Sequence, residues 1–327
     1  MSMIGRAWHL GKQMKILNRT VVWKEDGIEL IADKRHAEEI VKEAKLKDDR
    51  KSLVPAPVEE KVKPNEAWRG EVQEMDMTAR KQRGRRLAEE IQDGRAEREA
   101  EELVPENEVR RFRGVAARAN YLSQDRPDLK YAALKLCRCM SSPRTKDWAL
   151  VERIARYLKA RPVVACVFAW QGPDEKIIAY SDSDWAGDRI TRRSTSGGCL
   201  MRGIHTIKCW AKTQHVIALS SGEAELFACV RAASESNGLQ SVMRDMGVMA
   251  GIKVYVDASA AIGMLMKEGL SGVRHIDTQF LWVQAAVKKK EIAVKKVDGK
   301  LNTADMFTKA LGSQELEGHL RRAGHRW

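Results

Sequence analysis

Apolar residues in the second half of the chain form short runs and amphipathic stretches, whose spacing predicts strands and helices. Strands are predicted at 176–183, 195–202, 205–212, 253–256 and 292–297. Helices are predicted at 220–246, 258–266, 275–289 and 302–310. Three antiparallel strands followed by alternating helices and strands predict an α/β fold, a mixed five-stranded sheet flanked by helices.

The first half of the chain has a different pattern. Apolar runs at 16–23 and 28–32 flank Asp26 and Gly27, and an Asp-Gly pair in that place predicts a hairpin. Helical periodicity follows at 37–46, 109–122, 127–140 and 146–158, and a strand is predicted at 163–170. Residues 71–102 are dense in Arg, Lys and Glu, which is typical of a linker or of a solvated charged helix.

These changes of pattern divide the chain into five segments. We expect a small α+β segment (1–46), a charged linker (47–106), a helical subdomain (107–162), the α/β domain (163–312) and a C-terminal tail (313–327).

Charge and cysteine content limit the partners and the cellular compartment that we expect for this protein. The net charge of the 327 residues is +13, which suits a polyanionic partner, although a well-solvated basic protein explains it equally well. None of the six cysteines forms a C-x-x-C pair, which argues against a zinc site and favours a reducing, intracellular setting in nucleus or cytoplasm. No signal peptide or membrane helix is predicted.

Carboxylates stand at the ends of several predicted elements. Asp182 and Asp257 end strands, Glu225 lies in the first turns of a helix, and Asp305 lies near the start of another. Converging carboxylates repel one another unless a cation neutralises them, and Mg²⁺ prefers such oxygen ligands. Enzymes that hydrolyse phosphodiesters commonly use two such ions. Each residue alone also fits a cap or a surface position, and Asp184 and Glu223 compete with Asp182 and Glu225.

Five motifs carry a family resemblance: DSDWAGD at 182–188, RSTSGG at 193–198, ALSSGEAE at 218–225, RHID at 274–277 and NTADMFTK at 302–309. Together they resemble the ribonuclease H domain of copia-type LTR retrotransposon polyproteins over about residues 163–311. Segments 26–28, 32–38, 118–122 and 126–128 are more loosely similar to the end of the adjoining reverse transcriptase and its connection. The Asp-Asp motif of the polymerase is absent, so polymerase activity is disfavoured.

The resemblance implies a fold, a site and a reaction. It implies a ribonuclease H-like sheet and a catalytic, metal-binding set of Asp182, Glu225, Asp257 and Asp305. The ions would be two Mg²⁺, with Mn²⁺ as the alternative. The reaction would be endonucleolytic hydrolysis of the RNA strand of RNA–DNA hybrids. Cellular ribonucleases H carry a His before the last carboxylate, but residues 298–301 contain none, so a Lys or a water would assist product release.

Basic residues near the motifs are candidates for substrate contact. Phosphate contacts are predicted for Arg192, Arg193, Lys208, Lys212 and Lys300, since such contacts give affinity without reading sequence. In the RHID motif, His275 and Asp277 are predicted to be structural. The missing reverse transcriptase region is a second candidate partner. The competing hypothesis is a catalytically decayed or repurposed nucleic-acid-binding remnant of a reverse transcriptase.

Overall fold

A five-stranded mixed sheet forms the centre of the C-terminal half. The computed structural model describes residues 11–58, 77–173, 176–266 and 279–327. The sheet has the order β7-β6-β5-β8-β9, with β5 antiparallel to β6, β6 antiparallel to β7, and β5, β8 and β9 parallel. The strands are β5 (Lys176–Asp184), β6 (Thr195–Arg202), β7 (His205–Thr213), β8 (Gly251–Val256) and β9 (Ile292–Lys296). The predicted fold class is confirmed.

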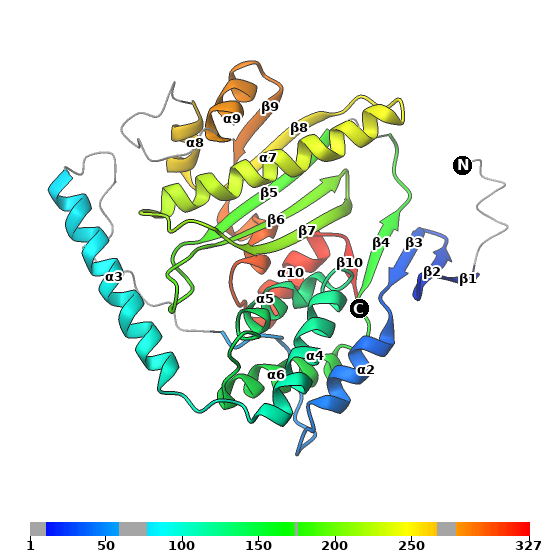
Figure 1. Cartoon of the computed structure of the whole chain (residues 1–327). Helices are drawn as coiled ribbons and strands as arrows, with labels where there is room; N and C mark the ends of the chain where they lie inside the picture. Colours follow the sequence, from blue (N-terminus) through cyan, green and yellow to red (C-terminus); the bar gives the residue numbers. More distant parts are fainter. Residues whose placement is uncertain (1–10, 59–76, 174–175, 267–278) are drawn as a thin grey trace.

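Helices cover both faces of this sheet (Figure 1). One face packs against α7 (Ser221–Asp245), α8 (Ser259–Met266) and α9 (Gln279–Lys288). Alternate residues of the central strands, such as Ile177, Ala179 and Val254, point into this layer and are completely buried. The other face packs against η6 (Thr303–Phe307) and α10 (Ser313–Arg322). Period-two alternation along the strands therefore supplies both layers of the core.

The end of the chain is integrated into the fold, where the sequence pattern suggested a tail. Leu316 and Leu320 lie four residues apart on α10 and are buried against the sheet. Residues His325–Arg326 form β10, which pairs with β4. The spacing of Leu316, Leu320 and Ala323 is the local signal for this helix.

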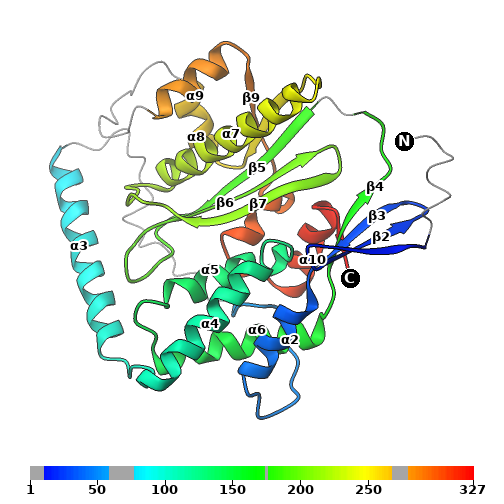
Figure 2. The same cartoon turned by 45° about the vertical axis from the view of Figure 1, so that its right-hand side comes forward.

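A second sheet combines three strands of the N-terminal segment with β4 and with β10 near the C-terminus. Its order is β1-β2-β3-β4-β10 and every pair is antiparallel. Its other strands are β1 (Gln13–Ile16), β2 (Arg19–Lys24), β3 (Gly27–Ile31) and β4 (Ala165–Ala169). The predicted hairpin is β2–β3, which projects beside β4 (Figure 2). The predicted strand at 163–170 forms as β4, but it belongs to this sheet and not to the central one.

The helical subdomain is built on a separate apolar core. It contains α4 (Glu106–Leu122), α5 (Lys130–Arg138), α6 (Trp148–Ala160) and the short η3 (Pro127–Leu129) and η4 (Thr145–Asp147). The helix α2 (Lys34–Glu43), which the sequence pattern placed in the N-terminal segment, packs into the same core. Ile40, Phe112, Leu136 and Val151 are completely buried in this core. The predicted helices are all present, which follows from their clear 3.6-residue periodicity.

The charged segment forms a long helix, α3 (Met77–Glu99), along one side of the molecule (Figure 1, Figure 2). Its contacts are mainly polar. Arg98 pairs with Asp147 at 2.5 Å and Glu90 with Arg192 at 3.0 Å. This agrees with the charged helix that the composition allowed. Among the described residues no helix is both long and apolar enough to cross a membrane.

Candidate active site

Asp182 is placed by the end of β5 and by the close approach of η6. It is 4% exposed and lies opposite Gly197 of β6. A Cβ on Gly197 would lie 2.6 Å from Cγ2 of Thr308, which is too close for any side chain. The glycine therefore lets η6 pack against the sheet, and Thr308 Oγ1 donates a hydrogen bond to Asp182 Oδ2.

Glu225 is placed by the first turns of α7. Ser220 caps this helix by accepting a hydrogen bond from the amide of Glu223 at 3.1 Å. The carboxylate of Glu223 turns back to accept from the amide of Leu219 at 2.8 Å, a reciprocal cap. Glu225 points toward β5 instead and accepts from the amide of Ser183 at 3.0 Å. The ambiguity between Glu223 and Glu225 is thus decided by the cap.

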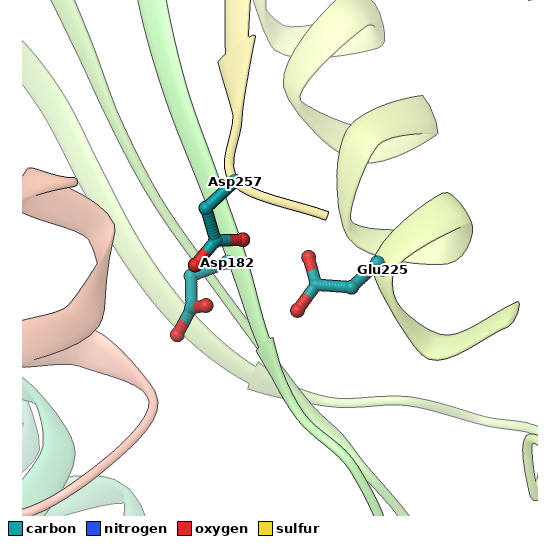
Figure 3. A group of neighbouring side chains, drawn as sticks. All are labelled: Asp182, Glu225 and Asp257. Carbon is teal, nitrogen blue, oxygen red and sulfur yellow. The ribbon is translucent and has the colours of Figure 1, made fainter. Parts of the chain in front are cut away.

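Asp257 follows β8 directly. Because β8 runs parallel to β5, with Val256 paired to Ser181, both strands end at the same edge of the sheet and Asp257 comes beside Asp182. One carboxylate oxygen each of Asp182, Glu225 and Asp257 lies within 4.8 Å of the others. Figure 3 shows these three carboxylates turned toward one another. We call them the triad.

Asp305 is held on η6, which packs against β5, the strand that carries Asp182. Asn302 fixes this turn, since its Nδ2 donates to the carbonyl of Ser181 at 2.9 Å and its Oδ1 accepts from the amide of Ala304 at 3.2 Å. Asp305 is not a member of the triad cluster. Its Oδ2 forms an ion pair with Lys309 Nζ at 2.8 Å.

Burial and the charge of neighbouring acids raise the pKa values of Glu225, Asp257 and Asp305. Desolvation, followed by the charges of Asp182 and Asp257, raises the pKa of Glu225 well above its ordinary value. The pKa of Asp257 is raised by burial and by Asp182. Burial and the charge of Asp182 raise the pKa of Asp305 to about 7, against the opposing effect of Lys309. The protein therefore holds several acids close together, and their raised pKa values favour the binding of a proton or another cation.

This site predicts an unusual pH dependence of stability in metal-free protein. A carboxyl whose pKa is higher in the folded chain than in the unfolded one stabilises the fold while protonated, and this contribution is lost as the pH rises. We therefore expect the thermal unfolding midpoint in EDTA to fall from about pH 4 through the pKa of Asp305 at about 7. Asp305→Asn should make the fall shallower, and a midpoint that rises over this range would contradict the argument.

The donor set fits a hard divalent cation. Glu225 Oε2 and Asp305 Oδ1 are buried and have no hydrogen-bond partner among the described residues. Buried carboxylate oxygens without donors are costly, and a cation would supply what they lack. All candidate ligands are oxygens, which suits Mg²⁺ or Mn²⁺ better than a soft metal.

Two of the five predicted phosphate contacts form ion pairs with carboxylates of the chain. Arg192 donates to the carbonyl of Ala186 at 3.0 Å and pairs with Glu90 of α3, while Lys208 pairs with Glu235 of α7 at 2.6 Å. Arg193, Lys212 and Lys300 are exposed. Of these, Lys300 is in the turn beside the site, since a Cβ on Gly299 would lie 3.5 Å from Asp257 Oδ2. The RHID motif at 274–277 lies outside the described residues.

Three further residues support the site and were not singled out from the sequence. Gln214 is buried and its Nε2 donates to Ser196 Oγ and to the carbonyl of Ala224, both at 2.9 Å, which ties β6 to α7. Thr308 and Lys309 contact Asp182 and Asp305. Their positions three and four residues after Asp305 on a helical turn were the available signal.

Comparison with curated proteins finds transposon relatives. The chain is 29% identical over 216 residues to the retrovirus-related Pol polyprotein from transposon RE2 of Arabidopsis thaliana, covering 65% of the chain and 15% of the relative. It is 30% identical over 195 residues to that of transposon TNT 1-94 of Nicotiana tabacum, covering 59% and 14%. The secreted RxLR effector protein 161 of Plasmopara viticola is 37% identical over 111 residues, which are 34% of the chain and 78% of that relative.

Among solved structures, an RNase H1 isolated from compost aligns with 45% of the chain and 99% of its own length, with a TM-score of 0.30 and 15% identity. An N-terminal RNase H domain from Mycobacterium tuberculosis aligns with 46% and 99%, with a TM-score of 0.31 and 12% identity. No protein-family model matches the chain.

The chain spans only 14–15% of the length of the two plant polyproteins, so it corresponds to one portion of them. On these similarities, the chain is homologous to one portion of the retrovirus-related Pol polyproteins of copia-type transposons.

Proposed function

We propose that the chain is a ribonuclease H, which hydrolyses the RNA strand of RNA–DNA hybrids endonucleolytically with divalent cations. The observation that carries this proposal is the triad, in which three separate elements bring carboxylates within 4.8 Å of one another. A ribonuclease H-like sheet in a chain that is homologous to a portion of Pol polyproteins supports a nuclease function in general. The proposal further includes specificity for RNA–DNA hybrids and the use of two metal ions.

The residues that would hold the ions are the triad and Asp305. Two bound Mg²⁺ would supply an activated water and would neutralise charge on the scissile phosphate and on the leaving oxygen. The chain itself holds the acceptors rigidly. Thr308 orients Asp182, the amide of Ser183 orients Glu225, and Asn302 fixes the turn that carries Asp305.

Direct attack by water fits the side chains at the site. The triad and its hydrogen-bond partners include no cysteine, and the Thr308 hydroxyl is engaged with Asp182, so a covalent intermediate is not expected. Products with a 3′-hydroxyl and a 5′-phosphate are expected from the family resemblance. Exposed Lys300, beside Asp257, is the best placed of the predicted phosphate contacts.

Cleavage of labelled hybrids by the full chain tests this proposal. We expect Mg²⁺-dependent cutting of the RNA strand alone, complete loss of cutting in EDTA and recovery when Mg²⁺ is restored. Double-stranded DNA of the same sequence is the matched substrate control, because it lacks the 2′-hydroxyl that distinguishes RNA. Equal cutting of both duplexes would contradict hybrid specificity.

A nucleic-acid-binding remnant is the second candidate. The net charge of +13 favours it, because a basic chain attracts a polyanionic partner whether or not it is catalytic. In the same assay this candidate predicts binding of the hybrid that weakens as salt rises, without cutting at any Mg²⁺ or Mn²⁺ concentration.

A further inference from the structure

Lys309 places a positive charge inside the carboxylate cluster. Its Nζ lies 2.8 Å from Asp305 Oδ2, and its side chain is 34% exposed, against 12% for that of Asp305. Its ammonium also interacts electrostatically with Asp182 and Asp257. A half-buried lysine therefore lies beside Asp305, close to the carboxylates of the triad.

The backbone of Lys309 is fixed while its side chain reaches toward solvent. Its amide bonds to the carbonyl of Asp305 at 3.2 Å, and the adjoining Ala310 packs against the core of the helical subdomain. A long flexible side chain on a fixed backbone can leave one carboxylate for another partner without a change of fold.

We propose that Lys309 is a counter-cation that holds Asp305 in the metal-free protein and is displaced from it when a divalent cation binds. This inference rests on the proposed metal-dependent function and adds a residue to it. Lys309 is a positioning residue in this scheme, because it acts on a ligand and not on the substrate.

Charge balance gives the physical reason. Four ionised carboxylates leave the cluster strongly negative, and one ammonium offsets part of that charge. Two divalent cations would neutralise the four acids by themselves, so the ammonium becomes a surplus like charge next to the metals. Metal and Lys309 therefore compete for Asp305, and the lysine lowers the affinity for metal while it stabilises the empty site.

Calorimetric titration of the full chain with Mg²⁺, without nucleic acid, tests this competition. Lys309→Met should bind Mg²⁺ about tenfold more tightly, because the competing charge is gone. The same variant should unfold at a lower temperature than wild type in EDTA. Lys309→Arg keeps the charge and should resemble wild type. Lys300→Met removes a charge from the neighbouring turn and should change affinity much less.

The possible outcomes separate this inference from the proposed function. Unchanged or weaker Mg²⁺ binding by Lys309→Met, with binding by wild type, overturns the role of Lys309 alone. If neither protein binds Mg²⁺ or Mn²⁺, the metal-dependent function fails as well. Lys309→Gln keeps an N–H donor for Asp305 without the charge, and should show the same tightening if Lys309→Met does not fold. In Asp305→Asn, removal of Lys309 should have a smaller effect than in wild type.

Discussion

Asp257→Asn is expected to abolish cleavage of RNA–DNA hybrids while leaving the fold intact. Asp257 belongs to the triad and is half-buried after β8. An amide has no charge with which to hold a cation, so we expect a loss of about 4 kcal/mol of transition-state stabilisation, a factor of about a thousand in rate. Single-turnover cleavage at saturating Mg²⁺ measures this loss.

The stability of the same variant distinguishes a catalytic defect from misfolding. In EDTA, the thermal midpoint of Asp257→Asn should equal or exceed that of wild type, because one of several mutually repelling acids has been neutralised. Asp245→Asn removes an exposed carboxylate at the end of α7 and is the matched control, with activity expected at the wild-type level. Cleavage by Asp257→Asn within tenfold of wild type would remove Asp257 from the site.

Arg126→Met is expected to cost more stability than any surface change in the N-terminal half. Arg126 is 2% exposed, and its guanidinium makes a two-point contact with Asp128 at 3.0 and 2.7 Å. It also donates to the carbonyl of Arg161 at 3.0 Å, which joins η3 to the end of α6. Removing one partner of a buried pair leaves the other charge uncompensated, at a cost of about 3–5 kcal/mol in the free energy of unfolding.

Urea denaturation of two comparison variants shows whether the buried charge is the cause. Arg126→Met combined with Asp128→Leu removes both charges and should recover most of the loss, since apolar replacement of a buried pair is often neutral. Arg19→Met breaks the more exposed pair of Arg19 and Asp125 and should cost less than about 1 kcal/mol. Equal losses for Arg126→Met and the double variant would point to lost packing instead.

Local patterns were sufficient for most elements of this chain. The apolar run before Asp182, the Ser220 cap and the Asp26–Gly27 turn are short-range signals, and each predicted its strand, helix or hairpin correctly. The carboxylates at element ends, together with the family resemblance, predicted a set of four acids, and three of them, Asp182, Glu225 and Asp257, lie together in the structure. Periodicity reports what each segment buries, so it determines elements well.

Partners across the fold were decided only by tertiary structure. Nothing local shows that β4 pairs with β3 and β10 and not with β5, or that α10 closes the second face of the central sheet. Whether Glu223 or Glu225 joins the carboxylate cluster depends on which of the two side chains takes part in the helix cap. Asp305 lies outside the triad and forms its ion pair with Lys309 in a partly buried position. Pairing and burial depend on residues distant in sequence, and charge interactions become strong only once water is excluded.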